Sequence, residues 1–305
     1  MPKYTFPLSA GTTDEYEYEI PAQTDGSTVR YYIYAADNDG NESWYPTKRT
    51  TQASPNIEFY TVRDNGMLVY DIQYTMDPFG DSPLETQEVT VKGVVTASTK
   101  IGDLGYLYIQ DETGSAWSGI WCVGIGLNQF YRNEEVEVTG VVEEYYGMTR
   151  LNVTSANKTG NLGNVSATVL DPSDSASYAN FGWEPYESMF IRYEQPNGKL
   201  HISQTNLGFG DFAVSSSNTA AVSHSGRVLA GRQSTTAYSS LDVQLVTDTS
   251  YSSLDGEINV TPIVVSDTMT FDAIEGILFY GFSNYRLVPR NNNDFIERPL
   301  VHGHK

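Results

Sequence analysis

The sequence predicts an all-β protein, and three observations support this fold class. Residues typical of strands and turns are abundant: Tyr contributes 22 of the 305 residues and Gly contributes 26. Short segments alternate polar and apolar residues with the period of a half-buried strand, as in Glu15–Ile20. Turns rich in Asx and Gly, such as Asp37–Asn41, separate these segments. A chain of this length can form two or three domains with cores of their own.

Electric charge limits the functions that the surface can serve. The chain has 38 acidic and 18 basic residues, a net charge of −20, which repels polyphosphate at long range and argues against a general nucleic-acid coating protein. Only 18% of the residues are charged, below the usual ~25%. Ser, Thr, Asn and Tyr must therefore cover much of the surface, as is common in extracellular β-proteins. We expect an extracellular or cell-surface location.

Cysteine content and hydropathy restrict the chain further. Cys122 is the single cysteine, so no disulfide can form within the chain, and its apolar neighbours predict a small buried side chain. No apolar stretch approaches the ~18 residues needed to cross a membrane, so no membrane insertion is expected. The residues after Met1 read as a strand rather than a signal peptide, so a secreted protein would be present here as a mature or excised form.

Residues 1–50 form the first expected unit. Its strands and turns at Ile20–Ala22, Val29–Asp37 and Gly40–Ser43, before Pro46, resemble the C-terminal half of a bacterial immunoglobulin-like domain. A full sandwich needs roughly 100 residues, about twice what is present. The resemblance therefore implies a partial sandwich with open strand edges. The expected partner at such an edge is a neighbouring domain or another copy of the chain, forming a homopolymer.

From residue 86 the alternation becomes regular and predicts a small barrel over residues 86–160. A connector over residues 51–85 precedes it, with the domain boundary near residue 55. The first and fourth predicted strands contain an interior glycine, Gly93 and Gly140, which suits strong curvature. The five predicted strands cover residues 89–96, 105–111, 118–123, 136–142 and 148–153.

Short motifs in this barrel are similar to those of a known family. The matching segments are Val89–Thr96, Gly105–Asp111, Ser118–Ile120, Val138–Gly140 and Glu144–Thr149. Residues 84–153 thereby resemble the OB-like domain found beside the catalytic domain of bacterial extracellular nucleases. Later segments continue the resemblance less closely: Tyr186–Met189, Phe209–Asp211 and Asn284–Arg290. The resemblance implies an OB-like barrel that is the non-catalytic part of such a protein.

Residues 161–298 read as a second, diverged OB-like domain, followed by a tail over residues 299–305. Gly140 to Arg150 and Gly276 to Arg286 both span ten residues and pass through a turn containing Tyr and Gly. Gly105–Ile109 also parallels Gly210–Val214. A fixed internal period indicates duplication, although two imperfect copies can also arise by chance.

Ligand-binding candidates are the aromatic and cationic residues of the barrel, because OB barrels use aromatic rings on their exposed sheet face as stacking platforms. The alternative is that part of this set lies in the core and that Arg286 is a structural ion-pair partner. The candidates are Tyr106, Tyr108, Trp117, Trp121, Tyr145, Tyr146 and Arg150, with Tyr285 and Arg286 in the second copy.

Catalytic and metal-binding motifs are scarce. The chain contains no HExxH, GxSxG or P-loop pattern, so we predict no catalytic residues and no enzymatic activity. Asp37, Asp39 and Asn41 place oxygens at alternate positions, as in a Ca²⁺ loop, but the Glu at the loop's last position is lacking. A structural Ca²⁺ ion there and a plain Asx–Gly turn are the two alternatives, and no other cofactor is expected.

These observations predict a secreted, non-catalytic OB-fold module that binds extracellular nucleic acid or polysaccharide. Two alternatives remain open. The partial sandwich could link copies into a filament or surface assembly by strand exchange. The chain could also be a fragment of a secreted nuclease.

Overall fold

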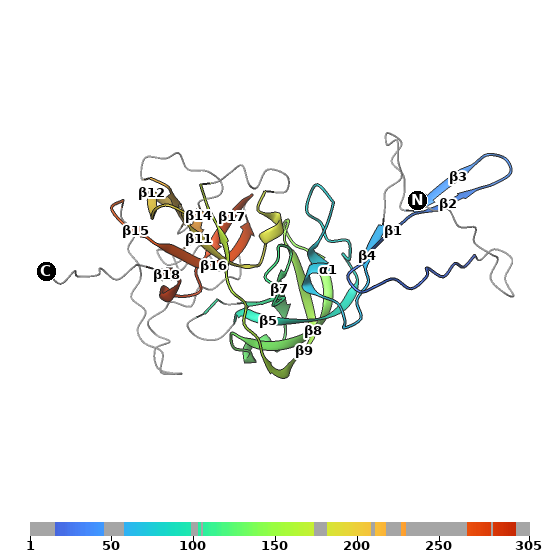
Figure 1. Cartoon of the computed structure of the whole chain (residues 1–305), viewed down its shortest axis with the longest axis horizontal. Coiled ribbons are helices and arrows are strands. Elements are labelled where there is room, and N and C mark those ends of the chain that lie inside the picture. Colours follow the sequence, from blue (N-terminus) through green and yellow to red (C-terminus); the bar gives the residue numbers. More distant parts are fainter. Residues whose placement is uncertain are drawn as a thin grey trace. The chain divides into compact units, whose positions relative to one another are not determined.

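The structure is a computed structural model of the chain, and it describes residues 16–45, 58–98, 103–104, 106–173, 182–208, 211–217, 227–229, 267–281 and 283–296. The chain divides into two compact units, residues 1–66 and 67–305 (Figure 1). Strands dominate both, which confirms the all-β prediction. In the described parts of the chain, no helix is long and apolar enough to cross a membrane.

The boundary between the units lies at Gly66 rather than near residue 55. The predicted connector over residues 51–85 is divided between the units. Strand β4 (Glu58–Thr61) pairs with a strand of the first unit. Helix α1 (Val69–Gln73) places two buried side chains in the barrel core. The segment was predicted to be a linker because it is rich in turn-forming residues. Its first half instead pairs with the first unit through β4, and its second half packs on the barrel through α1.

The first unit consists of two antiparallel ribbons in its described residues, rather than the two packed sheets of a sandwich. Strand β1 (Thr28–Tyr31) pairs with β4, and β2 (Ile33–Ala36) pairs with β3 (Glu42–Tyr45). None of the side chains described in this unit is buried. A two-stranded ribbon is at best marginally stable alone, so these ribbons expose apolar side chains that a complete sandwich would cover.

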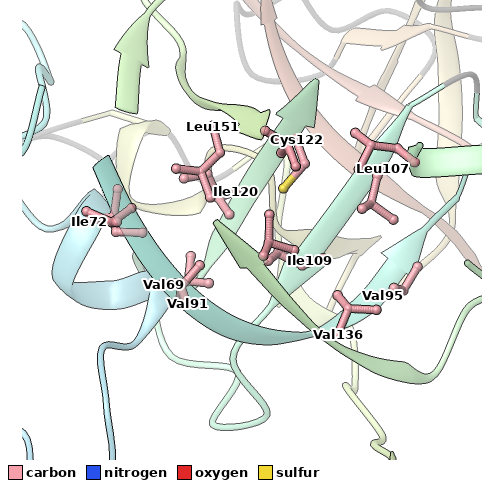
Figure 2. Close-up of a cluster of buried hydrophobic side chains, with 14 of the residues drawn as sticks. Val69, Ile72, Val91, Val95, Leu107, Ile109, Ile120, Cys122, Val136 and Leu151 are labelled. Atoms are coloured by element: carbon pink, nitrogen blue, oxygen red, sulfur yellow. The ribbon is translucent and has the colours of Figure 1, made fainter. Parts of the chain in front are cut away.

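The second unit begins with the predicted OB-like barrel. Five strands close in the order β5-β6-β7-β9-β8, with β7 and β9 parallel and the other pairs antiparallel. Alternate residues of these strands fill the core, and Cys122 lies in it as predicted (Figure 2). The strands are β5 (Glu88–Ala97), β6 (Leu107–Gln110), β7 (Gly119–Gly124), β8 (Glu134–Glu144) and β9 (Thr149–Leu162).

Helix α1 is fixed to this barrel at its N-terminus. The Asp111 carboxylate accepts hydrogen bonds from the backbone N–H groups of Val69 and Tyr70, at 3.0 and 2.9 Å. These donors have no partner within a helix, and a carboxylate also complements the helix dipole. Val69 and Ile72 consequently point into the barrel core (Figure 2).

A nine-stranded sheet forms the rest of the second unit. Its path is β10-β11-β16-β17-β14-β13-β12-β15, and β18 pairs with β16. The strands are β10 (Thr168–Leu170), β11 (Phe190–Glu194), β12 (Leu200–Gly208), β13 (Asp211–Ser215), β14 (Arg227–Leu229), β15 (Thr270–Phe271), β16 (Ala273–Gly281), β17 (Asn284–Val288) and β18 (Phe295–Ile296).

Five neighbouring strands of this sheet repeat the topology of the barrel. The order β12-β13-β14-β17-β16 matches β5-β6-β7-β9-β8, and the β14–β17 pair is parallel as the β7–β9 pair is. The register agrees as well, because Arg150 lies opposite Glu143 and Arg286 lies opposite Phe279. Glu143 follows Gly140 by three residues, and Phe279 follows Gly276 by three residues. This agreement supports the duplication that the Gly-to-Arg spacing indicates.

The second copy is an open sheet rather than a second barrel over the described residues. In the first copy β8 pairs with β5 and closes the barrel. In the second copy β16 pairs instead with β11 and β18, while β12 pairs with β15. The additional strands β11, β18 and β15 thus pair with β16 and β12, the two strands whose pairing would close a barrel. This difference was not predictable from the spacing shared by the two copies.

The C-terminal sheet packs on the β6–β7 face of the barrel. Gly119 in β7 permits the approach, since a Cβ at this position would lie 2.6 Å from the Ser188 carbonyl oxygen. The Gln110 side chain accepts a hydrogen bond from Phe190 N–H at 2.8 Å. An apolar cluster with members from both parts fills the contact: Ala97, Leu104, Tyr108, Trp121, Met148, Phe190, Ile277, Phe279 and Val288. The face that OB folds commonly use for ligands is therefore covered in this chain.

Candidate functional site

The turn between β8 and β9 presents the most exposed aromatic residues among the candidates. Tyr145 and Met148 close it with two backbone hydrogen bonds, and Tyr146 and Gly147 both have positive φ, 52° and 79°. This is the geometry of a type I′ hairpin, which suits the twist of the flanking strands. Tyr146 is 83% exposed and Tyr145 is 40% exposed. The turn predicted from the sequence thus displays two rings to solvent.

Arg150 in β9 supports the first of these rings. Its guanidinium carbon lies 3.7 Å from the centre of the Tyr145 ring and 5.3 Å from that of Trp121. Trp121 is buried and meets Tyr145 edge-on at 5.9 Å. Such contacts fix the ring orientation and limit the entropy lost when a ligand binds. We call Glu143, Tyr145, Tyr146 and Arg150 the aromatic hairpin.

Glu143 neutralises the cation of the aromatic hairpin. Its carboxylate oxygen lies 2.9 Å from Arg150 Nη2 and also accepts a bond from Nε at 3.0 Å. The other oxygen accepts a hydrogen bond from the Asn152 amide at 2.8 Å. Glu143 was not among the ligand-binding candidates predicted from the sequence. Its cross-strand position opposite Arg150 could have been found by pairing the two strands through the hairpin turn.

The remaining barrel candidates are less accessible than predicted. Tyr108 is completely buried, and Trp117 and Trp121 are nearly so, because the C-terminal sheet and neighbouring loops cover them. These three rings serve the core and do not lie where a ligand could stack. Tyr106 is half-buried and packs edge-on against Trp121 at 5.2 Å.

The two candidates of the second copy have structural partners. Arg286 is buried, with Nε 2.6 Å from Asp211 Oδ2, and it also donates to the Gly281 carbonyl. The alternative interpretation of Arg286, a structural ion-pair partner, therefore describes its position. The hydroxyl of Tyr285 donates to the carboxylate of Glu184. Neither side chain is placed to receive a ligand from solvent in the way that Tyr146 is.

A carboxyl cluster that was not predicted from the sequence lies beside the aromatic hairpin. Its members are Asp81, Glu144, Glu184 and Glu187. Burial is the largest cause that raises the pKa of each, and it brings the pKa of Glu184 to about 7. No linear spacing connects Glu144 with Glu187, so only the packing of the sheet on the barrel reveals the cluster.

The Ca²⁺ candidate of the first unit is a hydrogen-bonded turn. Asp37 Oδ1 accepts bonds from the backbone N–H groups of Asp39 and Asn41, at 2.9 and 2.8 Å. Asp37 Oδ2 accepts a bond from the Asn41 amide at 2.7 Å. This last bond is the largest cause that lowers the pKa of Asp37. Both oxygens thus hold the turn, which is the arrangement of a plain Asx–Gly turn. Among the residues described in the structure, no three or more His, Cys, Asp or Glu side chains form a group that could hold a metal ion.

Comparison with known proteins gives no family for the chain. No protein-family model and no curated protein matches it. Among solved structures, the OBody AM1L10 bound to hen egg-white lysozyme shares 17% identity over 34% of this chain and 100% of that chain, with a TM-score of 0.24. A putative aspartyl-tRNA synthetase from Leishmania major Friedlin shares 13% identity over 39% of this chain and 24% of that chain, also with a TM-score of 0.24. The OB-like description rests on the strand order of this chain itself.

Proposed function

We propose that the chain is a non-catalytic, polysaccharide-binding module of an extracellular protein, and that the aromatic hairpin is its docking surface. The observation that carries this proposal is the pair of exposed tyrosine rings, one of which is fixed by Arg150. Tyrosine offers a rigid apolar face and a hydroxyl, a combination suited to sugar rings. The turn occupies the position of the loop between the fourth and fifth OB strands, which binds oligosaccharides or oligonucleotides in such folds.

Charge favours a polysaccharide over a nucleic acid at this surface. A nucleic acid gains most of its affinity from cations that contact phosphates. Arg150 is paired with Glu143 and Arg286 with Asp211, and the chain carries a net charge of −20. Binding through the hairpin would therefore depend on ring contacts and hydrogen bonds. A fragment of a secreted nuclease is the less favoured alternative, because such a protein would also have to bind nucleic acid.

Loss of both rings of the hairpin tests the proposal. We expect the double variant Tyr145→Ala/Tyr146→Ala to bind polysaccharides roughly thirtyfold more weakly, given about 1 kcal/mol for each ring. Affinity electrophoresis against a panel of soluble polysaccharides, followed by calorimetry on any that bind, measures this. Tyr131→Ala is the matched control, because Tyr131 is 50% exposed and is not part of the hairpin. Unchanged affinity, or tighter binding to single-stranded DNA than to every polysaccharide, would contradict the proposal.

The first unit supports a second candidate function, a structural subunit that associates through strand edges. Its described ribbons bury no side chain. The described residues of this unit expose six large apolar or aromatic side chains, four of them on the ribbons and two before β1: Ile33, Tyr34, Tyr45 and Tyr60, with Tyr16 and Ile20. Open ribbons with such faces are templates for pairing with another strand.

Light scattering over a range of concentrations tests this second candidate. We expect oligomers that dissociate in Ile33→Lys, because a charge on an edge strand opposes strand pairing. Asn38→Lys places the same charge in the neighbouring turn and serves as the control. A protein that remains monomeric at the highest soluble concentration would exclude assembly through this unit.

A further inference from the structure

The carboxyl cluster has no cationic partner among the residues that the structure describes. Its four groups come from three segments: the loop before β5 supplies Asp81, the end of β8 supplies Glu144, and the turn before β11 supplies Glu184 and Glu187. None of the ion pairs of the described residues includes any of them. Four acidic groups that repel one another in a partly buried site must lose charge by some means.

Glu187 is the most deeply buried of the four, at 2% exposure. Its Oε1 accepts a hydrogen bond from Thr149 N–H at 2.9 Å, whereas Oε2 has no hydrogen-bond partner. The hydroxyl of Tyr108 is also buried and unpartnered, and it is close enough for the charge of Glu187 to raise its pKa further after burial. A neutral carboxyl group carries an O–H donor and avoids a buried charge, so protonation resolves the unpaired oxygen.

Glu184 is held in the same site by different contacts. It accepts a hydrogen bond from the Tyr285 hydroxyl in β17, and a Cβ on Gly80 would lie 2.6 Å from its carboxyl carbon. The titratable groups that face it are Tyr285, Glu187, Glu144 and Asp81. Burial is the largest cause that raises its pKa; the hydrogen bond from Tyr285 lowers the pKa, and the repulsion of Glu144 and Asp81 raises it further.

These contacts connect the start of β9 to the C-terminal sheet. Thr149 donates its backbone N–H to Glu187 and its hydroxyl to Glu144, at 2.9 and 2.7 Å. On the other side of the turn, Gly147 lies against Tyr280 of β16, since a Cβ there would be 3.0 Å from the ring. The backbone of the β8–β9 turn, which presents the exposed tyrosines, is therefore attached to the C-terminal sheet through the carboxyl cluster.

We propose that the carboxyl cluster is a proton-dependent latch, which holds the β8–β9 turn against the C-terminal sheet when Glu184 and Glu187 are protonated and releases it when they ionise. A proton is the neutralising species in this proposal because Glu187 is buried with one carboxylate oxygen that has no hydrogen-bond partner, which a neutral carboxyl group tolerates better than an ionised one. The latch involves no ligand and is independent of the polysaccharide proposal.

The direction of the pH effect follows from the raised pKa. The pKa of Glu184 is about 7 in the folded chain against an ordinary 4.5. The stabilisation is therefore complete below pH 4.5 and is lost as the pH rises to about 7. Glu187, whose pKa burial also raises, contributes in the same direction.

Amide hydrogen exchange at pH 5.5 and pH 8.0 tests the latch in the full chain. After correction for the intrinsic rate, we expect the Thr149 amide to exchange at least roughly tenfold faster at pH 8.0 in the wild type. In Glu184→Gln and Glu187→Gln, which keep the shape and remove the charge, the difference should shrink to less than about threefold. Glu88→Gln, an exposed glutamate of β5, should behave as the wild type.

Three results would overturn the latch. The first is equal protection of Thr149 at both pH values in the wild type, a measurement that needs no variant to fold. The second is an unchanged pH difference in Glu184→Gln. The third is a rise of the thermal midpoint with added Ca²⁺ or Mg²⁺ at pH 8.0 that Glu187→Gln abolishes, which would show that a cation neutralises the cluster.

Discussion

Replacing Arg290 by alanine should lower the free energy of unfolding by about 3–5 kcal/mol, because it leaves a buried carboxylate without its partner. Arg290 is 8% exposed, and its guanidinium binds both oxygens of Asp294, at 2.8 and 3.0 Å. It also donates to the Thr96 carbonyl of β5 at 3.0 Å and lies 3.7 Å over the Phe190 ring. One side chain thus joins the barrel to the C-terminal sheet.

Urea unfolding with linear extrapolation measures this loss. Arg192→Ala is the matched control: Arg192 pairs with Glu194 and with Glu275 at 2.9 Å, and its side chain is 25% exposed. Such an exposed pair contributes at most about 1 kcal/mol. Equal losses for the two variants would show that Arg290 does not hold the two parts together. A second unfolding transition in Arg290→Ala would show instead that it maintains their cooperativity.

The barrel was predictable from sequence because its signals are local. Alternating valines, an interior glycine in two strands and a Tyr-Tyr-Gly turn each constrain the backbone within a few residues. Gly140, for example, is required because a Cβ there would lie 2.7 Å from the Asn152 carbonyl oxygen across the ladder. The spacing shared with Gly276 is equally local, and a Cβ on that equivalent glycine would lie 2.4 Å from the Val288 carbonyl oxygen.

Burial of the barrel face was not predictable in this way. Tyr106 and Tyr108 alternate with the same period whether they face a ligand or another sheet. Phe190 and Phe279 lie far along the chain and pack on this face of the barrel, so these tyrosines face another sheet and not a ligand. The carboxyl cluster is hidden for the same reason, since Glu144 and Glu187 meet only after the sheet has docked. Long-range packing, rather than local pattern, therefore separates the true surface from the core.

The equivalent arginines of the two copies should respond differently to alanine. Arg286→Ala should cost about 3 kcal/mol in the free energy of unfolding, because buried Asp211 would keep only Arg227, 3.6 Å away. Arg150→Ala should cost about 1 kcal/mol, because Arg150 and Glu143 are both partly exposed. Its larger effect should be on polysaccharide affinity, since Tyr145 would lose the guanidinium beneath its ring.

Paired unfolding and binding measurements distinguish these roles. The expected pattern is a crossed one: Arg286→Ala unfolds at lower urea but binds as the wild type while folded, and Arg150→Ala retains stability but binds roughly tenfold more weakly. The matching register places the two side chains at equivalent points of the β8–β9 and β16–β17 hairpins, so the contrast comes from their surroundings. Asp211 and the open sheet bury one arginine, and the exposed turn leaves the other beside solvent. Parallel losses of stability would mean that the aromatic hairpin is a structural feature, and the docking surface would have to lie elsewhere.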